Sequence, residues 1–403
     1  MSHMRAWLGK GFPMVLSAAP GVHPPPAALA RLGDDERPSR PKTNRSMNIV
    51  VFCPSLIGDT VMATPTFRAL RQEFPDARMT AVLKPNVVPV LDGTAWFDDA
   101  ILFHPRAKNH DQRASALLKR LRADRPDAAV LLPNSIRTAW ISWRAGVRRR
   151  VGYDRYGRGP LLTDRLKPPR DEAESLRPFP AVEYYLALAR ALGCRDAGLQ
   201  LELATTPADE AAADESCRAL GIDPGRPLVC LNNGGAFGPS KGWPNGYFAF
   251  LARRLAEELG ASVVMLCGPA ERDAARAVAA LATHPQVVSL ADQRLSIGLS
   301  KAFVRRARLL ITTDSGPRHF AAALGTPVVT LFGPTGITWT RTNFPHAVHL
   351  YHPVPCQPCQ RPVCPLGHHN CMRKLVPDDV FQVARRMLVG GRSGARPPSP
   401  ESR

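Results

Sequence analysis

Phosphate binding is the first chemistry that the residue types of this chain suggest. The tetrapeptide Asp314-Ser315-Gly316-Pro317 follows the apolar run 309–312, which predicts a buried strand. A short polar residue followed by proline predicts that a helix begins there, with a side-chain oxygen as its cap. Backbone N–H groups at a helix N-terminus attract phosphates, but most strand-turn-helix units hold no ligand, so both alternatives stay open.

A second segment with the same chemistry is 232–244, NNGGAFGPSKGWP. Gly234 and Gly235 would let the backbone approach a ligand closely, and Lys241 offers a point charge to a phosphate. The segment is not a P-loop, because it lacks the spacing and the lysine–serine/threonine pair of that motif. Glu271, in the turn after a further apolar run, could bind ribose hydroxyls, although an acidic residue in a first helical turn needs no ligand.

Asp59 is the candidate for proton transfer. It lies in the turn that follows the apolar run 48–53. Open parallel sheets keep their sites at this edge, where a carboxylate could accept a proton from an attacking hydroxyl. A helix-capping aspartate is the alternative interpretation.

Four cysteines near the C-terminus, Cys356, Cys359, Cys364 and Cys371, have the pattern C-x2-C-x4-C-x6-C. They could close a structural zinc site, but the spacing differs from common zinc ribbons. Packed reduced thiols or a disulfide are the alternatives. Other cysteines lie in apolar runs, which favours a reducing compartment.

Seven arginines lie between Arg137 and Arg158, interleaved with tryptophan and tyrosine. A basic aromatic surface suits a ligand with carboxylates or phosphates, and a solvated charged face is the alternative. The formal net charge of +19 likewise favours an acidic partner, unless it only reflects frequent arginine use. No apolar run reaches the ~18 residues of a membrane span.

The candidate residues follow apolar runs that alternate with helical segments in both halves of the chain. This pattern predicts an α/β fold of two Rossmann-like domains with parallel sheets. The first turn lacks the G-x-G-x-x-G motif, which argues against a nicotinamide or flavin enzyme. Since the phosphate-type turns lie in one half and the lone carboxylate in the other, we predict a site in the cleft between the domains.

The 403 residues exceed the usual size of a single core, so two domains are expected. We predict a proline-rich disordered extension before Met47, which could be the natural start, and a disordered tail at the other end. The predicted boundaries are 1–46 for the extension, 47–205 and 206–376 for the two domains, 377–390 for a C-terminal helix, and 391–403 for the tail.

The chain resembles the ADP-heptose:lipopolysaccharide heptosyltransferases, the family 9 glycosyltransferases of the GT-B fold, and most of all their heptosyltransferase II branch. Four blocks carry the resemblance, and they are specific in combination. They are NIVVFCPSLIGDTVMATPTFRALRQEFPDA (48–77), NNGGAFGPSKGWP (232–244), CGPAE (267–271) and TTDSGPRHFAAALGTPVVTLFGPT (312–335).

The resemblance implies an inverting transfer of L-glycero-D-manno-heptose from ADP-heptose to the inner core of lipopolysaccharide. It implies no cofactor, an acceptor-binding first domain, a lipid A–core oligosaccharide acceptor, and a cytoplasmic protein in peripheral contact with the inner membrane face. The C-terminal helix would cross back to the first domain. The implied roles are general base for Asp59, diphosphate binding for Lys241, the phosphate turn for Asp314, Ser315 and Gly316 with His319 beside it, and ribose binding for Glu271.

Fixed donors at Lys241 and the helix N-terminus could stabilise a departing diphosphate without a metal. Two alternatives remain: a relative that transfers another sugar to another glycan, and a non-catalytic protein that binds nucleotides or nucleic acid. No nucleic-acid-binding motif supports the latter, so no nucleic-acid partner is expected.

Overall fold

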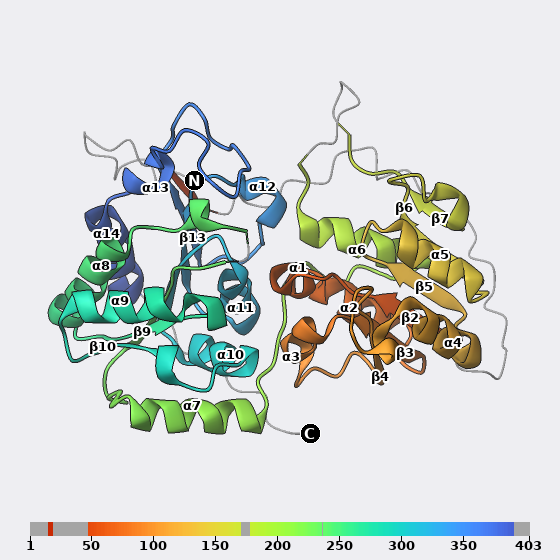
Figure 1. Cartoon of the computed structure of the whole chain (residues 1–403), viewed down its shortest axis with the longest axis horizontal. Coiled ribbons are helices and arrows are strands. Elements are labelled where there is room, and N and C mark those ends of the chain that lie inside the picture. The colour runs from red at the N-terminus through yellow and green to blue at the C-terminus, as the bar shows by residue number, and fades with distance from the viewer. Residues whose placement is uncertain (1–14, 19–46, 171–177, 236, 391–403) are drawn as a thin grey trace. The chain divides into compact units, whose positions relative to one another are not determined.

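The structure is a computed structural model that describes residues 15–18, 47–170, 178–235 and 237–390 (Figure 1). The predicted disorder of 391–403 lies outside these residues. Within 1–46, where disorder is also predicted, the structure describes only strand β1 (Val15–Ala18), at one edge of the larger sheet.

The chain divides into two compact units, close to the predicted boundary at 205/206. Of the described residues, the N-terminal unit comprises 47–170, 178–201 and 341–343, and the C-terminal unit comprises 202–235, 237–340 and 344–390. No helix within the described residues is long and apolar enough to cross a membrane.

The N-terminal unit is built on a parallel sheet of six strands in the order β4-β3-β2-β5-β6-β7. This is the doubly wound order, which reverses direction between β2 and β5 and opens a crevice at their carboxyl ends. Side chains alternate along β2, so Val50 and Phe52 lie on one face of the sheet and pack against α4 and α5. Helices α2 and α6 contact each other. The strands are β2 (Asn48–Phe52), β3 (Arg78–Leu83), β4 (Asp99–Leu102), β5 (Ala128–Leu131), β6 (Arg149–Tyr153) and β7 (Asp164–Leu166). The main helices are α1 (Ile57–Met62), α2 (Thr64–Glu73), α4 (Ala114–Asp124), α5 (Ile136–Arg144) and α6 (Ala181–Leu192).

The C-terminal unit repeats this order with β10-β9-β8-β11-β12-β13, all parallel, and β1 added beside β13. Its switch point lies between β8 and β11. The strands are β8 (Leu228–Asn232), β9 (Ser262–Leu266), β10 (Val287–Ser289), β11 (Leu309–Thr313), β12 (Val328–Phe332) and β13 (Ala347–Tyr351). The main helices are α7 (Pro207–Ala219), α8 (Asn245–Leu259), α9 (Arg272–Ala282), α10 (Ile297–Arg306), α11 (Gly316–Leu324) and α14 (Pro377–Gly390).

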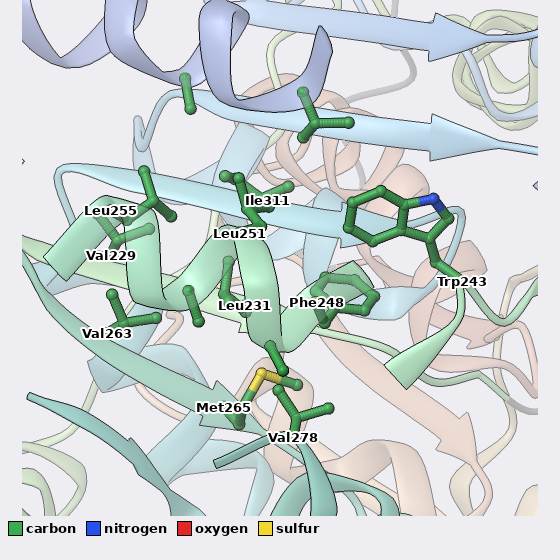
Figure 2. Close-up of a cluster of buried hydrophobic side chains, with 14 of the residues drawn as sticks. Val229, Leu231, Trp243, Phe248, Leu251, Leu255, Val263, Met265, Val278 and Ile311 are labelled. Atoms are coloured by element: carbon green, nitrogen blue, oxygen red, sulfur yellow. The ribbon is translucent and has the colours of Figure 1, made fainter. Parts of the chain in front are cut away.

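The core of the C-terminal unit lies between its sheet and the helices α8, α9 and α14. In Figure 2, Phe248 and Leu251 of α8 face strand residues such as Leu231 and Ile311. Their spacing places them on one helical face. Trp243 is buried in the same cluster and its indole Nε1 donates a hydrogen bond to the carbonyl of Leu375 at 2.8 Å. This anchors the chain two residues after Lys241.

Helix α14 completes this core. Val380, Phe381 and Ala384 are buried among the residues of α8, and the guanidinium of Arg254 lies 3.9 Å from the centre of the Phe381 ring. The resemblance implied that this helix crosses back to the first domain. In the structure, the apolar face of α14 is covered by α8 and β11 of the C-terminal unit, and the crossing back to the first domain stays a prediction.

Candidate functional site

Asp314 is the centre of a buried polar cluster at the carboxyl end of β11. Its Oδ2 accepts hydrogen bonds from Lys241 Nζ at 2.8 Å and from Thr335 Oγ1 at 2.7 Å, and its Oδ1 accepts one from Arg318 Nη1 at 3.0 Å. Lys241 Nζ also donates to the Asp314 carbonyl at 2.8 Å. The loops after β8, β11 and β12 therefore meet at one carboxylate, and the structure brings the predicted Lys241 and Asp314 together.

The charges of this cluster do not cancel. Burial by itself would raise the pKa of Asp314, but the charges of Arg318 and Lys241, with hydrogen bonds from Lys241 and Thr335, hold it well below its usual range. Asp314 is thus ionised, and it faces two cations. The cluster carries a surplus positive charge beside the first turn of α11, which favours an anionic ligand.

Ser315 occupies the N-cap position of α11, with Gly316 and Pro317 in the first turn. The predicted side-chain cap is wrong, because the Ser315 hydroxyl instead accepts from Asn232 Nδ2 at 2.9 Å and donates to the Thr313 carbonyl at 3.3 Å. These bonds tie the turn to the end of β8. They also leave the first N–H groups of α11 without a side-chain cap.

Neighbouring side chains leave no room for a side chain at Gly234 and little room for one at Gly235. A Cβ atom on Gly234 would collide with the carboxylate of Glu271, and one on Gly235 would lie 3.1 Å from the Cβ of Ser315. Glu271 is held there by the N–H of Gly268, which donates to its Oε2 at 2.7 Å. The structure therefore places Glu271 beside Gly234, and Ser315 beside Gly235.

His319 lies beneath this turn and is buried. Burial and the adjacent charge of Arg318 lower the pKa of His319 to about 3, so its imidazole is neutral at physiological pH. Its Nδ1 has no hydrogen-bond partner among the described residues. A role for His319 as a cation toward phosphate is therefore not supported by its environment.

In the N-terminal unit, Asp59 lies at the third position of the short helix α1. The residue at the N-cap is Leu56 and no side chain caps the helix, so the capping interpretation of Asp59 is wrong. No described residue donates a hydrogen bond to the carboxylate of Asp59. Burial raises the pKa of Asp59 to about 6. A buried carboxylate with a raised pKa suits a proton acceptor better than a partner in a structural ion pair.

A pocket of about 400 Å³ opens at the carboxyl ends of β2 to β5. Its basic lining residues are Lys84, His104, Arg106 and Arg137, and the hydroxyls of Ser55, Ser135 and Thr138 also line it. Within the described part of the chain, Lys84, Arg106 and Arg137 have no ion-pair partner. Free cations around a concave surface suit a carboxylate or phosphate ligand.

Part of the predicted arginine cluster makes contacts within its own unit. Arg148 and Arg149 pair with Asp127 and Asp164 at 2.9 and 2.7 Å. Arg158 is fully buried and donates to the carbonyls of Tyr153 and Pro133 and to the side chain of Asn134. Only Arg137 among the seven lines the pocket, so neither sequence interpretation describes the whole cluster.

The cysteines 356, 359, 364 and 371 are free thiols. Over the ranges that the structure describes, no group of three or more His, Cys, Asp or Glu residues is placed to hold a metal ion. The other three thiols lie close enough to Cys371 to raise its pKa together with burial. Zinc, packed reduced thiols and a disulfide all stay predictions for this segment.

Residues 114–370 match the family model described as glycosyltransferase family 9 (heptosyltransferase). The chain belongs to this family. It is 28% identical over 358 residues to lipopolysaccharide heptosyltransferase 2 of Escherichia coli strain K12, covering 85% of this chain and 99% of that protein. Lipooligosaccharide heptosyltransferase 2 of Haemophilus ducreyi is 27% identical, covering 85% and 100%.

Among solved structures, the chain is similar to the E. coli ADP-heptose LPS heptosyltransferase II. The TM-score is 0.71 at 25% identity, covering 86% of this chain and 100% of that one. The expected α/β fold of the GT-B class, with two Rossmann-like units, is confirmed. The chain is a glycosyltransferase of the heptosyltransferase family.

Sequence reasoning missed Arg318 and Thr335 as partners of Asp314. Arg318 lies four residues after Asp314 in the block 312–335. This spacing is about one helical turn, and it could have indicated that the two side chains interact. Thr335 ends the same block, but only the fold brings it back to Asp314.

Proposed function

We propose that this protein transfers L-glycero-D-manno-heptose from ADP-heptose to the inner core of lipopolysaccharide, with inversion at the anomeric carbon. The observation that carries the proposal is the Lys241–Asp314–Arg318 cluster, whose surplus positive charge lies beside an uncapped helix N-terminus. The similar E. coli protein is named an ADP-heptose LPS heptosyltransferase, which supports the same donor here.

The proposed reaction is a single displacement. Asp59 accepts the proton of an acceptor hydroxyl while that oxygen forms a bond to the anomeric carbon of the heptose. The bond from the anomeric carbon to the diphosphate oxygen breaks, and ADP leaves with the electron pair. Because attack and departure occur on opposite faces, the configuration inverts. Lys241 and the N–H groups of Ser315 and Gly316 stabilise the charge that grows on the diphosphate, and Glu271 binds the donor ribose.

The direct test is incubation of the purified protein with a panel of nucleotide-sugars and a heptose-deficient lipopolysaccharide. We expect product only with ADP-heptose. Transfer from a different nucleotide-sugar would instead identify a family relative with another donor. Because the acceptor carries lipid A, we also propose peripheral contact with the cytoplasmic face of the inner membrane.

The basic pocket supports an acidic acceptor. Replacing Arg106 or Arg137 with alanine should raise the KM for the lipopolysaccharide acceptor by about fivefold to tenfold, because each loses a charged contact of about 1–1.4 kcal/mol. Donor affinity should not change. Arg148→Ala is the control, since Arg148 is exposed, pairs with Asp127 and lies outside the pocket lining. Equal KM values in all three variants would contradict this placement of the acceptor.

We expect transfer to be independent of divalent metal. Lys241 and the start of α11 supply the positive charge at the diphosphate, and the sequence has no Asp-x-Asp pair in these loops. Turnover should therefore remain within about twofold after treatment with EDTA, measured with donor at saturation. Activity that disappears with EDTA and returns with Mg²⁺ or Mn²⁺ would contradict the expectation.

A further inference from the structure

The segment 356–371, here called the cysteine loop, makes contacts for which the reaction above gives no reason. On one side it packs on the turn η6 (Pro239–Lys241), which carries Lys241. On the other side it packs on residues 333–336, which follow β12 and carry Thr335. Lys241 and Thr335 both donate to the carboxylate of Asp314. The cysteine loop therefore contacts and stabilises both segments that supply these donors.

The contact with η6 is made through Ser240. Its N–H donates to the Pro362 carbonyl at 3.0 Å, its hydroxyl donates to the Arg361 carbonyl at 2.6 Å, and its carbonyl is 2.6 Å from Nε2 of His369. Ser240 is buried. All three polar groups of the residue before Lys241 are thus satisfied by the cysteine loop.

The close approach depends on Gly238. Its φ of +138° lies in the region that L side chains rarely adopt, and a Cβ atom there would lie 2.5 Å from the Pro362 carbonyl oxygen. The missing side chain of Gly238, in the GPSK sequence, therefore makes room for the cysteine loop rather than for a ligand.

The second contact uses Gln357 and Gln360. Gln357 Nε2 donates to the Gly333 carbonyl at 2.7 Å, and the N–H of Gln360 donates to the Pro334 carbonyl at 2.9 Å. A Cβ atom on Gly333 would collide with the side chain of Met372, which directly follows the loop, and would lie 3.4 Å from Sγ of Cys371 at the loop's end.

We propose that His369 is a positioning residue for donor binding, acting through Lys241. A carbonyl oxygen can only accept, so Nε2 of His369 carries the proton and donates to Ser240. This bond fixes the peptide plane between Ser240 and Lys241, and so fixes the direction in which the lysine side chain leaves the backbone. Pre-organising a charged group in this way increases affinity, because less freedom is lost on binding. The inference rests on the function proposed for this site.

The test measures ADP binding by calorimetry in the full-length protein. His369→Leu removes the donor and should raise the Kd for ADP by about tenfold. His369→Gln should restore most of the affinity, because its amide nitrogen is separated from Cα by the same number of bonds as Nε2. Both variants place a non-glycine residue at a φ of 53°, so backbone strain is common to them. His346→Leu, at an exposed site in the same unit, should bind ADP as the wild type does.

A double-mutant cycle with Lys241→Ala separates positioning from a general structural role. If His369 acts through Lys241, then His369→Leu should cause no further loss of ADP affinity in the Lys241→Ala protein. An equal loss in both backgrounds would overturn the inference, as would unchanged binding in His369→Leu alone. Should His369→Leu fail to fold, His369→Asn provides the test, because asparagine tolerates the positive φ of this position and its amide is one bond too short to replace Nε2. It should weaken ADP binding in the same Lys241-dependent way, and unchanged binding would again overturn the inference. A wild-type protein that does not bind ADP would overturn the proposed function itself.

Discussion

Replacing Asp59 with asparagine should lower turnover by roughly two to four orders of magnitude, while ADP affinity changes little. Asparagine keeps the shape and polarity of the side chain but cannot take the proton of the acceptor hydroxyl. The loss should therefore appear in the rate at saturation with both substrates. Steady-state kinetics with ADP-heptose and a heptose-deficient lipopolysaccharide measures it.

Unfolding experiments provide the control for this variant. Burial raises the pKa of Asp59 from its ordinary value of 3.8 to about 6, so the folded protein binds its proton more tightly than the unfolded chain does. This contribution stabilises the fold at low pH and is lost as pH rises from about 4 to about 6. At neutral pH, Asp59→Asn should consequently be at least as stable as the wild type. A variant that is both inactive and less stable would indicate a structural role for Asp59.

The same pKa predicts a pH dependence of catalysis. A general base must be deprotonated, so kcat/KM should fall about tenfold per pH unit below pH ~6 and level off above it. The residual rate of Asp59→Asn should lack this limb. An identical acidic limb in wild type and variant would assign the titration to another group.

The order of strands and helices was predictable because apolar runs of strand length alternate with helical segments in both halves. Thr64-Pro65 left two alternatives in the sequence, a kinked helix from Asp59 or a helix that restarts at Thr64, and in the structure α1 ends at Met62 and α2 begins at Thr64. The strand order and the small shift of the domain boundary were not visible, because they depend on contacts between residues far apart in the chain.

The individual roles of site residues were less predictable, because burial decides them. Arg137 and Arg158 look alike in the sequence. Arg137 lines a pocket, whereas Arg158 is buried and donates hydrogen bonds to residues 133–135. Gly234 looked like an approach for a ligand, but its missing side chain makes room for Glu271. Residue types and their spacing identified these positions in the sequence, but only the packing of the folded chain explains what each residue does.

Lys241→Ala should weaken ADP binding by about tenfold to a hundredfold and also slow transfer at saturation. Lys241 is placed to meet the diphosphate both before and during bond breaking, and charge on the leaving oxygen grows as the reaction proceeds. The variant should differ in kind from Asp59→Asn, which affects mainly the rate. Calorimetry with ADP and single-turnover transfer measure the two effects, and Lys374→Ala, at an exposed site, is the control.

Lys241 is a better test of this cluster than Asp314. Without Lys241, the carboxylate of Asp314 still has Arg318 and Thr335 as partners, so the fold should persist. Asp314→Asn would leave Arg318 buried without a counter-ion, which typically costs about 3–5 kcal/mol of stability. Its loss of activity would then confuse unfolding with lost binding. If Lys241→Ala unfolds at the wild-type temperature and binds ADP normally, the diphosphate does not contact Lys241, and the donor site proposed here is misplaced.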